Sequence, residues 1–234
     1  MRRDQPGGNA DVMTRNRTLI LSALVSSLCP LVGNGIWAGH GTEGGSILAS
    51  AREGLPVGGY VGLTLELVGL LGLGVLLGWF VTYLYERTPI AAVTTAIAGS
   101  AMLAVKVGSA GPLMVVDTMS DDLDPVIAEL LVSLNDQAFV ISGFLFCAAF
   151  LAAGVGLLST EFPRWLSWWA LIAGGLGVVA GAGGIVRPDN YVPVPFLLLL
   201  LWMIAVAISG VMGRLAPSRR IGANALRHPV AATE

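Results

Sequence analysis

The chain has 234 residues, of which 55% are hydrophobic and 12% charged, with a net charge of −2 and a mean hydropathy of +0.77. Soluble domains carry about 25% charged residues, so this composition excludes an ordinary soluble globular protein and indicates a helical membrane protein. The sequence has no basic patch with interleaved aromatic residues, which argues against nucleic acid as a partner and leaves the lipid bilayer as the expected surroundings.

Six apolar runs approach the ~20 residues that a helix needs to cross the ~30 Å hydrocarbon core of a bilayer. In chain order they cover residues 18–37, 57–84, 89–111, 137–158, 165–186 and 191–212. The sequence therefore predicts an all-α, polytopic bundle of six transmembrane helices. We expect one membrane domain over residues 18–213, with an N-terminal tail over 1–17 and a C-terminal tail over 214–234.

The arginines predict the orientation of the bundle. If the N-terminus lies in the cytoplasm, only Arg52 and Arg187 fall outside, and the other ten arginines fall on the cytoplasmic side. Those ten are Arg2, Arg3, Arg15, Arg17, Arg87, Arg164, Arg214, Arg219, Arg220 and Arg227. Cytoplasmic loops carry an excess of basic residues, so we expect a multi-pass protein of the cytoplasmic (bacterial inner) membrane with both termini in the cytoplasm.

An acidic cluster, Asp121, Asp122 and Asp124, lies in the loop predicted between the third and fourth spans. Several carboxylate oxygens are what a divalent cation requires, so the cluster is a weak candidate metal site. It lacks the ligand spacing of a calcium loop, and carboxylates also suit the start of a helix. A solvated loop before a helix is the preferred interpretation.

Asp124 followed by Pro125 is typical of a helix start, with an N-cap residue and proline at the first helical position. Apolar residues then recur at helical spacing: Val126, Ile127, Leu130, Leu131 and Leu134. We expect a short amphipathic helix over about 125–134, lying at the outer membrane surface before the fourth span.

Two charges lie well inside apolar runs, Glu66 in the second span and Lys106 in the third. A charge in the hydrocarbon core costs at least ~2.5 to 3.5 kcal/mol, so such residues are usually paired and often functional. Glu66 follows Tyr60 by six residues and Lys106 precedes Gly111 by five, which places them about 9 Å and 7.5 Å deep on antiparallel helices. The sequence predicts that they pair in the outer half of the membrane.

Asn34 near the end of the first span, and Asp136 with Gln137 at the start of the fourth, fall at a similar level. Together with Lys106 and Glu66 they indicate a polar cavity open to the outside. An ion pair that only fixes the register of two helices explains the two charges equally well, so both interpretations stay open.

No cofactor is predicted. Cys29 and Cys147 lie mid-span, where cysteines mostly behave as small apolar residues, and His40 and His228 fall on opposite sides of the membrane. Metal, nucleophile-elbow and phosphate-loop motifs are absent from the sequence. Three Gly-x-x-x-Gly patterns favour close contact between helices. They are Gly58 with Gly62, Gly74 with Gly78, and Gly177 with Gly181.

The second half of the chain carries a recognisable series of features. It runs from Leu130-Leu131-Val132-Ser133-Leu134, through a span with Phe139, Gly143, Phe144, Phe146 and Gly154, to Phe162-Pro163-Arg164-Trp165-Leu166 and Ala173-Gly174-Gly175. These features resemble an uncharacterised bacterial family of six-helix membrane proteins, a domain-of-unknown-function family in which a Phe/Leu-Pro-Arg/Lys-x-Leu turn links helices four and five. The resemblance covers about half of the chain. It implies the fold and topology and supplies no activity or catalytic residue.

The preferred function is non-enzymatic: an outward-facing polar pocket that binds or moves a small solute, an ion or a proton. Lys106 would be the anion-binding or proton-responsive site and Glu66 its partner. The alternative is an accessory or scaffold subunit whose glycine-lined faces pack against another membrane protein or a second copy. An intramembrane enzyme with Glu66 as base comes third, because no nucleophile or metal constellation accompanies it in the sequence.

Overall fold

The computed structural model of the protein describes residues 8–36, 43–54, 57–187, 191–213 and 215, with side chains from residue 16 onward. This part of the chain forms eight α-helices and no β-strand. The helices are α1 (Gly8–Ile36), α2 (Gly44–Glu53), α3 (Val57–Tyr85), α4 (Pro89–Gly108), α5 (Ala110–Thr118), α6 (Pro125–Leu157), α7 (Arg164–Val186) and α8 (Val194–Val211). Residues 1–7, 214 and 216–234 of the two predicted tails, and Trp37, lie outside the described residues.

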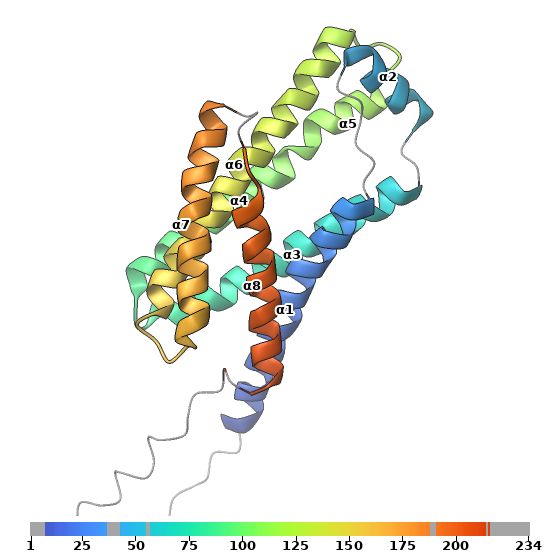
Figure 1. The fold of residues 1–234 in the computed structure, drawn as a ribbon. Helices are drawn as coiled ribbons and strands as arrows, with labels where there is room; N and C mark the ends of the chain where they lie inside the picture. The colour runs from blue at the N-terminus through green and yellow to red at the C-terminus, as the bar shows by residue number, and fades with distance from the viewer. Residues whose placement is uncertain (1–7, 37–42, 55–56, 188–190, 214, 216–234) are drawn as a thin grey trace, which may run out of the picture.

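Within the described residues, six segments are long and apolar enough to cross a membrane. They are Asn16–Ile36, Val57–Tyr85, Pro89–Thr118, Pro125–Leu157, Arg164–Val186 and Val194–Val211. Each runs antiparallel to the one before it, so that α1 begins and α8 ends at the same end of the bundle (Figure 1). The predicted all-α, six-helix membrane bundle is confirmed.

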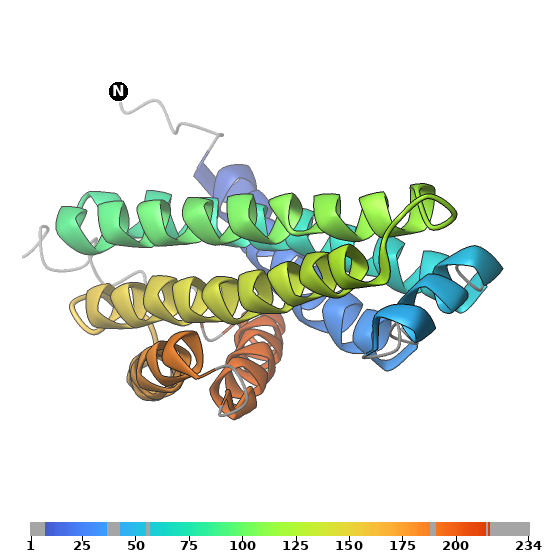
Figure 2. The ribbon, with the colours of Figure 1, turned by 90° about the horizontal axis from the view of Figure 1, so that it is seen from above.

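The six spanning helices form a closed ring. Each contacts the next in the chain, and α8 returns to contact α1. The long α4–α5 segment and α6 lie side by side when the molecule is seen from above (Figure 2). Beyond the end of α7, α5 and the first turns of α6 project together and carry α2 (Figure 1). We call these three elements the cap.

Three helices extend further than the sequence predicts, and the first of them, α1, begins at Gly8, ten residues before the expected start of its span and within the predicted N-terminal tail. The helix expected over 125–134 and the span expected from 137 form one continuous helix, α6, because no proline or glycine interrupts the chain between Val126 and Ser142. Similarly, the third span continues past its expected end at residue 111 as α5. Pro112 cannot donate to the carbonyl of Gly108, yet Ser109 keeps helical angles (φ −67°, ψ −18°), so the interruption is slight.

The third helix of the cap, α2, has no counterpart among the predicted elements. The amide of Glu43 donates to Ser46 Oγ over 3.3 Å at its start, and Gly54 ends it with a φ of 78°, in the left-handed region that favours glycine. Its residues Ile47, Leu48 and Ala51 pack with Val116 of α5 and Ala128 of α6 in a small core of their own. The apolar residues of 125–134 therefore lie on two different surfaces of the helix. Leu131 packs against this small core, whereas the others are exposed: Val126, Ile127, Leu130 and Leu134.

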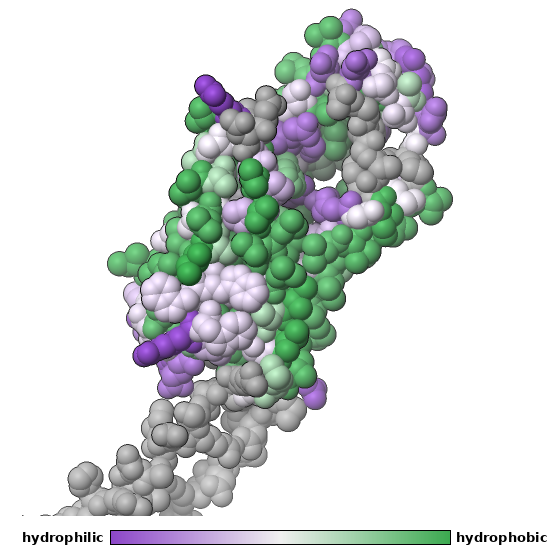
Figure 3. All heavy atoms as spheres, viewed as in Figure 1, coloured by the Kyte–Doolittle hydropathy of each residue, from purple (hydrophilic) through white to green (hydrophobic). Residues whose placement is uncertain are grey.

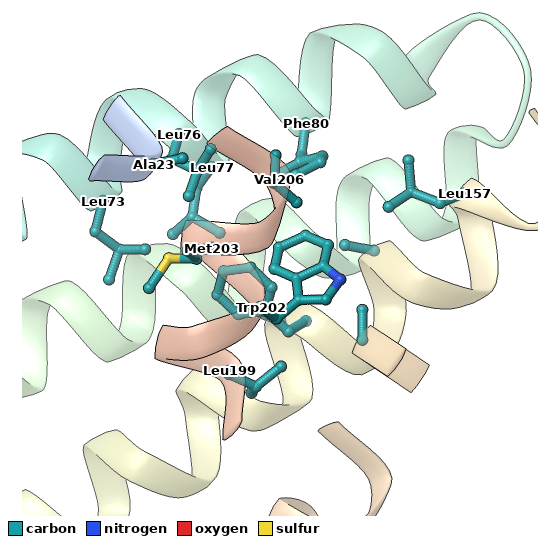
Figure 4. Packing of buried hydrophobic residues seen from close by; sticks show 14 of the residues in the cluster. Ala23, Leu73, Leu76, Leu77, Phe80, Leu157, Leu199, Trp202, Met203 and Val206 are labelled. Carbon is teal, nitrogen blue, oxygen red and sulfur yellow. The ribbon is translucent and has the colours of Figure 1, made fainter. Parts of the chain in front are cut away.

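The main core lies between the six spanning helices (Figure 4). Three buried aromatic rings from three helices meet there: Phe80 of α3, Phe150 of α6 and Trp202 of α8. The centroid of Trp202 lies 5.6 Å from that of Phe80 and 5.3 Å from that of Phe150. The indole Nε1 of Trp202 also donates to the carbonyl of Leu166 over 2.7 Å, which ties α8 to the start of α7.

Close approach of helices depends on glycines facing the neighbouring backbone. A Cβ at Gly154 of α6 would lie 2.7 Å from the nitrogen of Leu171, and a Cβ at Gly174 of α7 would lie 2.7 Å from the nitrogen of Leu151. Gly177 and Gly181 similarly meet α6, as their pattern predicts. In the Gly74–Gly78 pattern, a Cβ at Gly74 would lie 3.6 Å from Leu103 Cδ1 of α4, whereas nothing lies within 4 Å of a Cβ built at Gly78.

On the face drawn in Figure 3, the surface is hydrophobic along the middle of the bundle, whereas hydrophilic residues gather over the cap and at the opposite end. Large apolar side chains such as Leu71, Ile97 and Val179 are exposed on the outside of the bundle. A surface of this kind suits contact with lipid acyl chains, as expected of a multi-pass membrane protein.

Candidate functional site

The two intramembrane charges meet. Lys106 Nζ lies 2.8 Å from Glu66 Oε1, and both side chains are mostly enclosed, with 19% of Lys106 and 28% of Glu66 exposed. Lys106 lies in the last turn of α4, just before the junction with α5. The predicted pairing is present, and the geometry is that of a charge-assisted hydrogen bond in a partly desolvated setting.

The aromatic ring of one phenylalanine, Phe139, lies beside the Lys106 ammonium. Lys106 Nζ lies 5.0 Å from the centroid of the Phe139 ring, within the range in which a cation is attracted to an aromatic face. Phe139 is itself held edge-on by Tyr191, with 6.1 Å between the ring centroids. The ammonium thus has two partners on two helices, the carboxylate of α3 and the ring of α6.

A cavity of about 190 Å³ lies on the cap side of the ion pair. Its walls come from α1, α3, the α4–α5 junction and α6, and they include most of the polar groups of this region. The polar lining residues are Asn34, Glu66, Lys106, Ser109, Asn135 and Asp136. Asp136 is exposed, so this carboxylate belongs to the mouth of the cavity.

A second, smaller cavity of about 50 Å³ lies deeper in the bundle and is mainly apolar. Among its lining residues are Leu70, Leu73, Met102, Phe146, Phe196 and Leu200. The two cavities share Asn34, Glu66, Leu70, Lys106 and Phe139 as lining residues. We call the polar cavity on the cap side the outer cavity and the apolar cavity deeper in the bundle the inner cavity. The ion pair therefore lies at the boundary between the two.

Helical spacing explains how the walls form. On α3 the lining residues include Leu63, Glu66, Leu70 and Leu73, three or four residues apart, which places them on one face. The other helices follow the same rule, with Ser26, Pro30 and Asn34 on α1, Met102 and Lys106 on α4, and Asn135, Phe139, Ser142 and Phe146 on α6. Each helix of the site thus contributes a single stripe to the cavity.

The α1 wall is shaped by a proline. Pro30 packs into a hollow left by Gly69 of α3, where a Cβ would lie 2.6 Å from Pro30 Cδ. Since proline has no N–H, Pro30 cannot donate to the carbonyl of Ser26 one turn earlier. One turn later, Asn34 Nδ2 donates to the carbonyl of Pro30 over 2.8 Å, which fixes the Asn34 side chain beside the site.

Of the five predicted site residues, the structure brings four together: Lys106, Glu66, Asn34 and Asp136 all line the outer cavity. Gln137 lines neither cavity, because it lies about 100° around α6 from its neighbour Asp136. Asn135, one residue before Asp136, lines the outer cavity.

Sequence reasoning also missed Phe139, the ring beside the ammonium. It lies four residues after Asn135 and seven before Phe146, so an i, i+4, i+11 pattern on α6 could have identified the face. An aromatic residue in an apolar span carries no distinguishing signal until the neighbouring charge is known.

The weak metal candidate does not form a site. Among the described residues, no group of three or more His, Cys, Asp or Glu side chains could hold a metal ion. Asp121 instead pairs with Arg52 of α2 at 3.2 Å, and Asp124 Oδ1 accepts a hydrogen bond from the amide of Val126 over 2.8 Å. Asp124 is thus the N-cap of α6, as its place before Pro125 predicts.

A comparison with protein families matches residues 19–214 to a family described as domain of unknown function DUF4386. The matched segment includes five spans in full, the first span from Leu19 onward, and every residue of the ion pair and its cavities. Comparisons with curated proteins and with solved structures give no match. The chain belongs to the DUF4386 family of multi-pass membrane proteins.

Proposed function

We propose that this protein binds, and moves across or within the membrane, a small charged solute or ion at the pocket around Lys106 and Glu66. The role is non-enzymatic. The observation that carries the proposal is the position of the ion pair, which lines both an outer polar cavity and an inner apolar one. A pair that only fixed helix register would be expected in a dry helix contact.

Enclosed charges in a membrane bundle support the same conclusion. Each charge costs free energy to place there, and such residues usually mark pathways for substrates, ions or protons. The pair is accompanied by further polar groups, Asn34 and Asp136, that reach from the ion pair to the mouth of the cavity. A solute would therefore meet polar partners along its way in.

We propose further that the cap faces the outside of the cell and that both termini are cytoplasmic. Arg52 and Arg187 belong to the cap side, whereas Arg17, Arg87 and Arg164 lie toward the opposite end of the bundle. The basic residues of a membrane protein gather on the cytoplasmic side. The outer cavity would then open to the outside.

An accessory role has less support. That alternative drew on glycine-lined faces, but glycines of α1, α3, α6 and α7 already pack against neighbours of the same chain. Many of the small residues thus already take part in contacts within the ring.

The pocket can be tested by labelling two neighbouring positions of α3 with a membrane-impermeant, charged thiol reagent. Leu70 lines both cavities, whereas the side chain of Leu71 is 73% exposed on the outer surface of the bundle. In a Cys29→Ala/Cys147→Ala background on intact cells, Leu70→Cys should be labelled from outside and Leu71→Cys should not, because lipid excludes the charged reagent. Labelling after denaturation controls for the amount of each variant. Failure to label Leu70→Cys would overturn the proposal.

A further inference from the structure

We infer that the solute is a small zwitterion that carries an ammonium and a carboxylate close together beside a short apolar side group, as an aliphatic α-amino acid does. The inference rests on the proposed function, and it names the ligand from the charges and shapes of the two cavities.

The charge requirement follows from the ion pair. Lys106 and Glu66 neutralise each other at 2.8 Å, so this enclosed pair carries no net charge before a ligand binds. A purely anionic ligand at Lys106 would give the site an excess negative charge without a partner, and a purely cationic ligand at Glu66 would give it an excess positive charge. Leaving either charge unpaired in a low-dielectric site is costly. A zwitterion leaves neither unpaired, because its carboxylate binds Lys106 while its ammonium binds Glu66.

The surroundings suit the ammonium of such a ligand. The Phe139 ring already attracts one cation, Lys106 Nζ, at 5.0 Å, and beside Glu66 it forms an aromatic and carboxylate environment that a second ammonium can share. Asp136 is exposed at the mouth of the outer cavity, so it lies outside the enclosed ion pair that the ligand has to match.

The apolar side group follows from the inner cavity. This cavity has a volume of about 50 Å³ among side chains such as Met102, Phe146 and Leu200, which leaves room for a short apolar group. Since the ion pair borders this cavity, a zwitterion bound there directs its side group inward. A phosphatidylethanolamine headgroup carries the same two charges but no apolar group beside its ammonium.

The test uses the full chain in phosphatidylglycerol nanodiscs and isothermal titration with four matched compounds. Leucine carries all three features, 3-methylbutylamine lacks the carboxylate, 4-methylpentanoate lacks the ammonium, and glycine lacks the side group. Leucine should bind, and each of the other three should bind about ten- to a hundredfold more weakly, since one charge-assisted contact or the apolar burial is lost. Glu66→Gln and Lys106→Met should weaken leucine binding by a similar factor, while Arg52→Ala, at the exposed pair of the cap, should leave it unchanged.

Other outcomes overturn the inference in distinguishable ways. If 3-methylbutylamine binds as well as leucine and Lys106→Met strengthens the binding of this amine, the ligand is a cation. If 4-methylpentanoate binds as well as leucine and Glu66→Gln strengthens the binding of this carboxylate, the ligand is an anion. If phosphatidylethanolamine added to the nanodiscs abolishes leucine binding, a lipid headgroup occupies the site. If none of the four binds while Leu70→Cys is still labelled from outside, the zwitterion is wrong and the pocket stands. If labelling also fails, the proposed function fails with it.

Discussion

Lys106 Nζ lies 2.8 Å from Glu66 Oε1, and the contact joins the end of α4 to the first third of α3 at the border between two cavities. Both residues lie within regular helix, on the stripe of each helix that faces the cavity. The geometry of the two helices therefore fixes the positions of the charges. The pair joins α3 to α4 and at the same time lines both cavities.

Glu66→Gln and Lys106→Met should each lower the free energy of unfolding, since each leaves one enclosed charge without its partner. The double variant should lose less free energy of unfolding than the two single variants lose together, with a coupling of about 0.5 to 3 kcal/mol in a double-mutant cycle. Thermal unfolding in detergent, followed by tryptophan fluorescence, measures both. Arg52→Ala breaks an exposed pair with Asp121 and should cost no more than about 1 kcal/mol.

The same double variant separates a structural pair from a functional one. If Glu66 and Lys106 only fix helix register, the double variant regains stability and keeps whatever solute response the wild type shows. If they form the pocket, the double variant folds but loses that response. A solute response that survives in a stable double variant would contradict the pocket.

Gly154→Ala should destabilise the bundle, because its new Cβ would meet the backbone nitrogen of Leu171, which cannot move without shifting α7. Overpacking of this kind costs about 1 to 3 kcal/mol. Gly78→Ala is the matched control, since nothing lies within 4 Å of its Cβ and alanine is the better helix former. Gly154→Ala should unfold at a lower temperature than the wild type, and Gly78→Ala at a slightly higher one. Equal behaviour would show that α6 and α7 do not approach at Gly154.

Trp202→Phe should lower stability by removing the hydrogen bond from Nε1 to the carbonyl of Leu166 and part of the ring contacts with Phe80 and Phe150. We expect a loss of about 1 to 3 kcal/mol. Trp168→Phe, at an exposed tryptophan of α7, should have little effect in the same unfolding assay. A larger loss of stability in Trp168→Phe than in Trp202→Phe would contradict the position of the main core around Trp202.

Topology is tested with a reporter that is active only outside the cell. Fused after residue 234 it should give no signal, and inserted between Asp121 and Asp122, in the exposed turn between α5 and α6, it should give a strong one. Both results follow from the ten-to-two distribution of arginines. Activity at the C-terminal fusion would reverse the proposed orientation.

Some features follow from consecutive residues and can be predicted without coordinates. The six spans are of this kind, because hydropathy over ~20 residues measures the transfer of one helix into lipid. The N-cap at Asp124 depends on its own neighbours, and it is confirmed by the bond to Val126. The pairing of Glu66 with Lys106 was predictable for a further reason: two costly charges at equal depth on consecutive helices have few other partners.

Other features depend on contacts between distant parts of the chain. Ser26 and Met203, 177 residues apart, touch where α1 meets α8 and the ring closes, and no local pattern specifies that meeting. The choice of Asn135 over Gln137 and the placing of Phe139 beside Lys106 depend on the rotation of α6 against α4. That rotation is decided by close packing between α4 and α6, as at Gly156, where a Cβ would lie 2.9 Å from Ala91 Cβ. Hydropathy thus determines which segments enter the membrane, and only packing between helices decides which of their faces form the pocket.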